Sequence, residues 1–205
     1  IEKFIIARRL MYWQVYLHKT VLSAENMLIQ ILNRAKYLYK NSKKIYLSPD
    51  LKRFCENSFS IDEFIKDNTI LENFSRLDDY EIYASLKYWI KNKDFVLSNL
   101  SQKILNREIL KIRIQKIKFN KKTISENRLN MMKKENINLN ESKYFIFSDK
   151  VSNSLYSIHE SNIKILFKDG KIKDLSDSSD QFNLKVLAKT INKYFLCSPS
   201  EYLVE

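Results

Sequence analysis

The chain has 205 residues, of which 44% are hydrophobic, and a formal net charge of +12. This hydrophobic content is typical of a globular protein with a real core, so an intrinsically disordered chain is excluded. No apolar run approaches the roughly 18 residues that cross a bilayer, and the N-terminus lacks a signal-peptide cleavage site, so we expect a cytoplasmic protein without membrane contact.

Residues 1–40 predict one long helix with two unlike faces. The face expected to be buried repeats apolar residues at steps of three and four. This seam comprises Leu10, Leu17, Val21, Ala24, Leu28, Ile31, Ala35 and Leu38. Nearly opposite it, at about 100° per residue, lie Arg8, Tyr12, Val15 and Lys19, with Tyr16 beside them. Cationic and tyrosine side chains on one helix face favour the binding of an anion, so this segment is the first candidate for function.

Further helices are predicted after residue 40. Ser48 followed by Pro49 marks a helix start, and four phenylalanines anchor short helical pieces beyond it. These phenylalanines are Phe54, Phe59, Phe64 and Phe74. Residues 78–91 and 94–106 each place apolar side chains mostly on one side. Two such helices packing on the first predict a helical domain over residues 1–106.

Over residues 107–205 the hydrophobic pattern changes, and segments typical of strands alternate with segments typical of helices. Strands are expected over 109–119, 144–147 and 193–197, helices over 125–135 and 181–190, and a mobile loop over 136–142. Residues 163–175 predict a β-hairpin, because Asp169-Gly170 supplies the positive φ of its turn. We therefore expect a mainly helical α+β protein with a small antiparallel sheet in an α+β subdomain over 107–205.

Most of the positive charge falls in residues 103–134, which hold eleven lysines and arginines against two glutamates. One interpretation is a surface for nucleic acid or phosphate-bearing effectors, through Lys111, Arg113, Lys116 and Lys118. The other is a solvated strand face in a lysine-rich chain from an A+T-rich genome, in keeping with its single glycine. We favour compositional drift over nucleic-acid binding.

The segment from Arg8 to Lys19, Arg-Arg-Leu-Met-Tyr-Trp-Gln-Val-Tyr-Leu-His-Lys, resembles the helix that follows the metal centre in HD-domain deoxynucleoside triphosphate triphosphohydrolases. The segments 77–80, 107–112 and 168–197 also resemble parts of these bacterial phosphohydrolases. The resemblance implies that Arg8 contacts the phosphates of a deoxynucleoside triphosphate. It also implies that Tyr16 lies along the sugar or base, and that Lys19 adds a cationic contact.

His18 and Lys19 form a pair that lies near an activating nucleotide site in some relatives. For His18 we favour a structural role over an effector contact. Asp78 and Asp79 resemble a carboxylate pair for acid–base chemistry, but at a helix start they more simply complement the helix dipole. Cys55 and Cys197 lack the paired spacing of a zinc site and form no disulfide framework, so we expect reduced core cysteines.

The metal ligands that define the HD family are missing from this sequence. His18 is followed by Lys19 and His159 by Glu160, so no His-Asp dipeptide occurs. A hard metal site needs several such side chains converging at short range. We therefore predict no catalytic residue and no cofactor bound by this chain, with a divalent metal held by a part of the protein that precedes Ile1. Hydrolysis by this chain alone is not expected.

The sequence thus predicts the C-terminal portion of an HD-domain phosphohydrolase that supplies nucleotide-binding residues and forms a homo-oligomer. The alternative is a noncatalytic module that binds nucleic acid through residues 103–134. A steep loss of affinity with rising salt would mark that alternative, because each phosphate contact releases counterions. A third hypothesis is a degenerate remnant that folds but is inactive.

Overall fold

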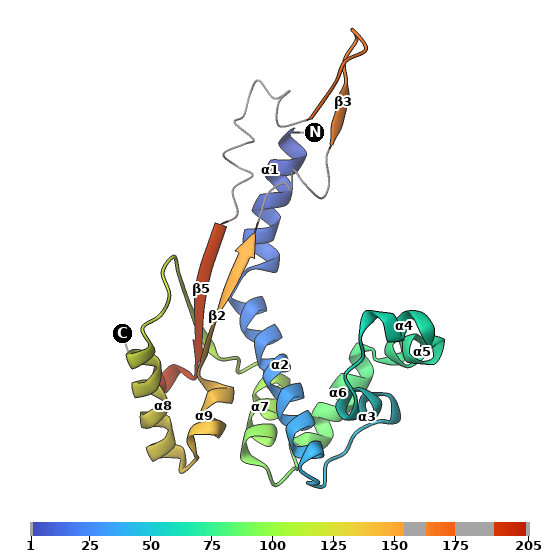
Figure 1. Cartoon of the computed structure of the whole chain (residues 1–205). Helices are drawn as coiled ribbons and strands as arrows, with labels where there is room; N and C mark the ends of the chain where they lie inside the picture. The colour runs from blue at the N-terminus through green and yellow to red at the C-terminus, as the bar shows by residue number, and fades with distance from the viewer. Residues whose placement is uncertain (1, 154–162, 175–190, 204–205) are drawn as a thin grey trace. The chain divides into compact units, whose positions relative to one another are not determined.

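The computed structural model of the chain describes residues 2–153, 163–174 and 191–203 (Figure 1). It is a mainly helical α+β protein with a small antiparallel three-stranded sheet, which confirms the predicted fold class. Among the described residues, no helix has the length and apolar character that crossing a bilayer requires. The helix predicted over 181–190 and the residue His159 lie outside the described residues.

Backbone contacts divide the chain into two compact units, which we describe separately. Unit 1 takes residues 1–22, 112–120 and 148–196, and unit 2 takes 23–111, 121–147 and 197–205. Each unit contains residues from both sides of position 106, because strands far apart in the sequence pair with one another. The domain boundary after residue 106 stays a prediction.

The predicted single helix over residues 1–40 is wrong. Helix α1 spans Glu2–Met11, a π-helix (η1) spans Tyr12–Tyr16, and α2 spans Lys19–Lys40. The break forms where the amide of Leu17 donates to the carbonyl of Tyr12 at 2.7 Å, five residues back instead of four. Leu10, predicted to be buried, is 52% exposed.

The sheet of unit 1 has the strand order β1-β5-β2. Strand β1 spans Lys111–Gln115, β2 spans Phe147–Asn153 and β5 spans Ile191–Ser198. Strand β1 is therefore shorter than the strand predicted over 109–119. The closing strand predicted over 193–197 is confirmed.

The predicted hairpin at Asp169-Gly170 is confirmed. Strand β3 (Lys164–Leu166) pairs antiparallel with β4 (Ile172–Asp174), and Ile165 faces Lys173 across the pair. Gly170 has a φ of 80°, which a side chain with a Cβ seldom adopts. The amide of Gly170 donates to the carbonyl of Phe167 at 3.0 Å and closes the turn.

Unit 2 is built on α2 from Ser23 onward, together with α6 (Asp79–Trp89) and α7 (Phe95–Leu105). Asp78 and Asp94 cap the two latter helices, accepting hydrogen bonds from the backbone amides of Glu81 and Leu97. The structural reading of Asp78 is therefore confirmed. The fully buried core includes Met27, Ile31, Leu86, Trp89, Val96, Leu97 and Leu100.

The buried face of α2 differs from the predicted seam because it includes polar residues. Ser23 is fully buried and donates to the carbonyl of Leu110 at 2.6 Å, while the sulfur of Met27 accepts from the amide of Leu110 at 3.2 Å. Val21 and Ala24, predicted for the seam, are only half-buried. A pattern of apolar residues cannot register a buried serine that satisfies a backbone carbonyl.

Arg34 is a buried cation at the centre of unit 2, with 6% of its surface exposed. Its guanidinium donates to both carboxylate oxygens of Asp94, at 3.0 and 2.6 Å, and contacts Glu141 at 3.4 Å. The rings of Tyr37 and Tyr144 lie 5.1 and 5.2 Å from its central carbon. Burial alone would lower the pKa of Arg34, but the hydrogen bond and charge of Asp94 raise it.

The short helices α3 (Pro49–Glu56), α4 (Ile61–Lys66) and α5 (Asn68–Arg76) gather around phenylalanines. Ser48 caps α3 as predicted. The ring centroids of Phe54, Phe59, Phe64 and Phe74 lie 5.5–6.4 Å apart, mostly edge to face. The prediction that these side chains anchor the short helices is confirmed.

The predictions for residues 139–146 are wrong. Helix α8 (Lys121–Glu135) is followed by α9 (Leu139–Phe145), where a loop and then a strand were expected. Asn138 and Glu141 form a capping box at the start of α9, so the polar run Asn136–Ser142 initiates a helix. The side chain of Arg128 on α8 donates to the carbonyl of Ile146 at 2.9 and 2.7 Å and holds the end of α9.

Both cysteines are buried in unit 2, as predicted. Burial raises the pKa of the Cys55 thiol and raises that of Cys197 to about 12. The phenol of Tyr202, in the short 3-10 helix Ser200–Tyr202, donates to Glu135 at 2.6 Å. Its pKa is raised by burial and by that carboxylate.

Candidate anion-binding site

The break between α1 and α2 shapes the candidate site of unit 1. A π-turn places one extra residue within a helix and often marks a functional site. After it, Leu17 leaves the helical backbone, and His18 accepts a hydrogen bond from the amide of Thr20 at 3.3 Å through its Nδ1 atom. This hydrogen bond joins His18 to the first turn of α2, and the structural role favoured for His18 stays a prediction.

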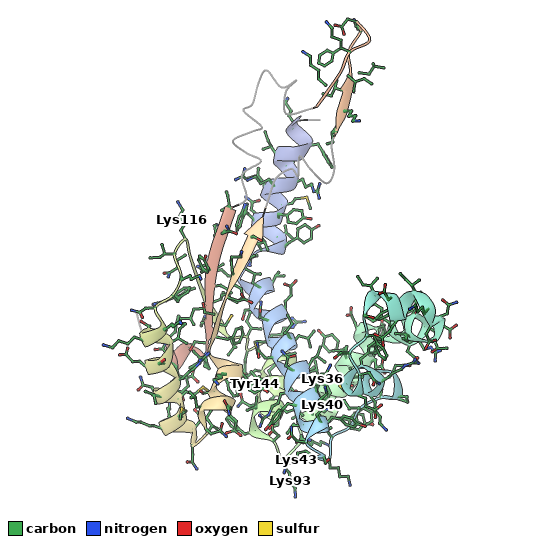
Figure 2. The ribbon with its side chains drawn as sticks, viewed as in Figure 1. Lys36, Lys40, Lys43, Lys93, Lys116 and Tyr144 are labelled. Atoms are coloured by element: carbon green, nitrogen blue, oxygen red, sulfur yellow. The ribbon has the colours of Figure 1, made fainter. Side chains whose placement is uncertain are left out.

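A cavity of about 480 Å³ lies beside this break, and we call it the Trp13 cavity. Its lining comes from the π-helix and the start of α2, from the end of β1 and from β5. The lining residues are Trp13, Leu17, His18, Lys19, Ile114, Gln115, Lys116 and Lys193. Because β1 and β5 are neighbours in an antiparallel sheet, the residues after β1 meet the first residues of β5. In Figure 2, Lys116 lies beside one end of β5.

The charges around the Trp13 cavity have one sign. Lys19, Lys116 and Lys193 line it, and none of the described lining residues is acidic. The Lys193 ammonium lies 3.8 Å from the centroid of the Trp13 indole, a close cation–π contact. No ion pair within residues 2–153, 163–174 and 191–203 neutralises these three lysines. An anion such as a phosphate group would relieve their mutual repulsion.

Arg8 and Tyr16 do not line this cavity. They belong to a ladder on the surface of α1 and the π-helix, in which the Arg8 guanidinium carbon lies 5.6 Å from the centroid of the Tyr12 ring. The Tyr12 and Tyr16 rings follow at 5.1 Å between centroids. Arg8 is exposed and Tyr16 is 50% exposed, so both can reach a ligand. The structure thus connects Arg8 to Tyr16 through Tyr12, and it places His18 and Lys19 separately in the lining of the Trp13 cavity.

The basic segment predicted as one surface divides between the two units. Lys111 belongs to unit 2, where it lines a pocket with Lys103, Arg107 and Glu108. Lys116 and Lys118 belong to unit 1. Lys116 lines the Trp13 cavity, whereas the Lys118 ammonium lies 6.0 Å from the centroid of the Tyr194 ring. Arg113 lies on β1 and is half-buried.

Metal binding needs several converging ligands. Within the described part of the chain, no three histidine, cysteine, aspartate or glutamate side chains gather closely enough to hold a metal ion. The described residues therefore do not fit the divalent metal that the HD resemblance implies, and no chemical step is assigned to such a metal on them.

Sequence reasoning missed Trp13 and Lys193, and it read Lys116 only as part of a basic segment. Lys193 is separated from Lys19 by most of the chain, so the pairing of β5 with β1 had to be known first. Trp13 follows Tyr12 in the sequence and was therefore not assigned to the predicted binding face of the helix. The π-turn changes the direction in which the side chains of this segment point. The nearest local signal was the unusual density of aromatic residues over Tyr12–Tyr16.

Comparisons with known proteins give the site its context. No protein-family profile matches the chain. It is 28% identical over 189 residues to the uncharacterized protein YwfO of Bacillus subtilis (strain 168), covering 87% of this chain and 40% of YwfO. It is also similar to the crystal structure of a phosphohydrolase from Bacteroides thetaiotaomicron VPI-5482, at 40% identity and a TM-score of 0.84.

The match to the Bacteroides phosphohydrolase covers 96% of this chain and 49% of that protein. The chain therefore spans less than half the length of YwfO and of the Bacteroides phosphohydrolase. In sequence and in fold it is similar to half of a phosphohydrolase.

Proposed function

We propose that this chain is the nucleotide-binding portion of an HD-domain phosphohydrolase that acts on deoxynucleoside triphosphates. The single observation that carries the proposal is the Trp13 cavity, where three lysines converge without an acidic neighbour among the described lining residues. The similarity to a phosphohydrolase supports it, because such enzymes bind phosphate esters or anhydrides. The divalent metal of the reaction would be held by another part of a longer protein.

The residues of unit 1 have distinct proposed roles. Lys19, Lys116 and Lys193 bind phosphate oxygens, and the Trp13 ring holds the Lys193 ammonium in place. The ladder that starts at Arg8 forms a second wall of the nucleotide site, in which the Arg8 guanidinium donates two parallel hydrogen bonds to a phosphate group. In that wall Tyr16 offers a half-exposed ring along a sugar or base. All of these roles concern binding and orientation of the nucleotide.

The test is a titration of the chain with a panel of deoxynucleoside triphosphates, in which ¹H–¹⁵N NMR spectra monitor binding. The chain has two tryptophans, and the indole N–H of Trp13 reports on the cavity that it lines. We expect its resonance to shift saturably as a triphosphate binds the Lys193 ammonium that the ring contacts. The double variant K19Q/K116Q is expected to weaken binding about tenfold, since two ammonium groups are lost.

The matched control is K150Q/K168Q, which removes the same charge from two exposed lysines of unit 1 outside the cavity. It should bind like the unmodified chain. Equal weakening in both variants would reduce the effect to net charge and refute the cavity as the site. The variant R8Q tests the second wall separately, because Arg8 does not line the cavity. Binding that only an oligonucleotide supports, with a steep salt dependence, would favour the nucleic-acid alternative.

A further inference from the structure

Unit 2 contains a second lysine-lined cavity that the proposed function does not use. It has a volume of about 560 Å³ and lies between the loop that follows α2 and the turn that joins α6 to α7. We call it the loop cavity. Its lining residues are Leu38, Lys43, Lys44, Lys91, Asn92, Lys93 and Asp94. Figure 2 shows Lys43 and Lys93 near one another beyond the end of α2.

Among the residues that the structure describes, no carboxylate neutralises the four lysines of the loop cavity. Asp94 is the acidic member of the lining, and both of its oxygens accept hydrogen bonds from Arg34. One of them also accepts the backbone amide of Leu97 at the start of α7. Within the described residues, none of the lysines in the cavity forms an ion pair. The net charge presented to a ligand is therefore strongly positive.

The two loops that carry these lysines are held by specific hydrogen bonds. The indole of Trp89 donates to the carbonyl of Tyr46 at 2.8 Å, and the side chain of Asn92 donates to the carbonyl of Lys44 at 3.4 Å. The side-chain oxygen of Asn92 accepts the amide of Asp94 at 2.9 Å. These hydrogen bonds hold the backbones of the two loops together, so that four like charges line one cavity. An anion bound there would reduce their mutual repulsion.

The helix dipole does not account for this arrangement. A helix C-terminus attracts cations within its last turn, and α2 and α6 end at Lys40 and Trp89. The cavity lysines lie beyond those ends, on the loops. The last carbonyls of α2 are already used, since the amide of Lys43 donates to Leu38 at 3.0 Å and Ser42 takes a positive φ of 56° to allow it.

We propose that the loop cavity binds a small, multiply charged oligophosphate group, free or carried by a nucleotide. Four ammonium groups suit several phosphate oxygens at once, and the cavity has room for a chain of about three phosphates. The proposal is independent of the Trp13 cavity, because it uses none of the same residues and lies in the other unit.

The experiment is a titration of the chain with inorganic tripolyphosphate at low ionic strength, in which ¹H–¹⁵N NMR spectra monitor binding. We expect the backbone amides of Lys91, Asn92 and Lys93 to shift saturably. The indole resonance of Trp13 reports the other cavity in the same spectra, so binding at one cavity can fail without affecting the reading at the other. A parallel titration with ATP distinguishes the source, since tighter binding of ATP identifies a nucleotide and equal binding a free oligophosphate.

The variant K43Q/K93Q is expected to weaken tripolyphosphate binding in the loop cavity about tenfold. The control K87Q/K133Q removes the same charge from two exposed lysines of unit 2 outside the cavity and should leave binding unchanged. An unshifted Trp89 indole resonance would show that each variant is folded. If K43Q/K93Q fails this check, K44Q/K91Q replaces it.

Three results would overturn the proposal. The first is the absence of any saturable shift at Lys91–Lys93 with tripolyphosphate or ATP. The second is equal weakening by the control variant, which would mean a diffuse charge effect. The third is a shift that only a long single-stranded oligonucleotide produces, which would assign these loops to nucleic acid.

Discussion

Asp94 serves two elements of unit 2 at once. It accepts two hydrogen bonds from Arg34 of α2, at 3.0 and 2.6 Å, and it caps α7 through the amide of Leu97 at 2.9 Å. The side chains of Arg34 and Asp94 are only 8% and 15% exposed. This one carboxylate therefore joins the centre of α2 to the first turn of α7.

The substitution D94N should destabilise unit 2 strongly. Asparagine can still cap α7, but it leaves the buried Arg34 charge without a full counter-charge. Breaking a buried pair in this way costs about 3 kcal/mol. Urea unfolding followed by the fluorescence of the buried Trp89 measures the effect. The exposed pair Lys52–Glu56 is the control, because K52Q should cost less than about 0.5 kcal/mol. A D94N effect no larger than that of K52Q would contradict the role given to this pair.

The substitution N138A should cost about 1 kcal/mol in the stability of unit 2, because it removes the side chain that caps α9. It also frees Glu141, whose carboxylate contacts Arg34 at 3.4 Å. The comparison is S60A, which removes the equivalent cap from α4 without disturbing a buried ion pair. Both are measured by urea unfolding. We expect N138A to be the more destabilising change, and the opposite order would argue against a supporting role for Glu141.

The free energy of unfolding should fall at alkaline pH because the Cys197 thiol is buried. Its ordinary pKa of 9.0 is raised to about 12 in the folded protein by burial. Between these two values the unfolded thiol has lost its proton while the folded one keeps it, so rising pH favours unfolding. The stabilisation is complete below pH 9.0 and declines toward pH 12, by at most about 1.4 kcal/mol per pH unit for one group.

The variant C197A isolates this contribution. The measurement is the slope of unfolding free energy against pH, which should become less steep in C197A whatever its absolute stability. A thiol reagent at pH 8 should react with neither cysteine in the folded protein and with both in urea, because Cys55 is buried as well. An unchanged slope would mean that other groups dominate the alkaline decline.

Deleting Gln14 should convert the π-helix into a regular helix, because a π-turn is one residue longer than an α-turn. The deletion would rotate Lys19 by about 100° relative to Trp13 and open the Trp13 cavity. Nucleotide binding there should weaken, while the contact of Arg8 with Tyr12 survives because both precede the deletion. The Trp13 indole resonance measures the binding. Unchanged affinity would show that the π-turn does not shape the site.

The substitution G170A should destabilise the hairpin of β3 and β4 by about 1 kcal/mol. An added Cβ would meet no atom within 4 Å, so the cost comes from the positive φ of 80° alone. G170N should cost less, because asparagine tolerates this conformation better than alanine. Cross-strand nuclear Overhauser effects between Ile165 and Lys173 report the hairpin population. Equal loss in both variants would point to a cause other than backbone strain.

The features predicted correctly from sequence depend only on residues that are close together in the sequence. The turn at Gly170 and the helix starts at Ser48 and Asp78 each follow from a residue type beside a helix or strand. The capping box of Asn138 and Glu141 carried a signal of the same kind, which the polar composition around it obscured. The buried Arg34 gave no such signal, because its partner Asp94 lies 60 residues away.

The candidate site was only partly accessible from sequence for the same reason. Lys19 was found because it lies on one face of the predicted helix, and His18 because the His-Lys pair is part of the family resemblance. Lys193 required knowledge of strand pairing. The roles of Arg8, Tyr16 and Lys19 in nucleotide binding stay predictions until the titrations are done. The π-turn has no composition signal of its own, so the separation of Arg8 from the cavity could not be foreseen.

The phenylalanine cluster of α3 to α5 has a consequence for the dynamics of unit 2. Its four rings contact one another across short helices, apart from the aliphatic core around Trp89. Such a satellite cluster can open as a cooperative segment while the rest stays folded. Amide protons of α4 and α5 should therefore exchange with deuterium sooner than those of α7, which makes this region the first protease-sensitive part of unit 2.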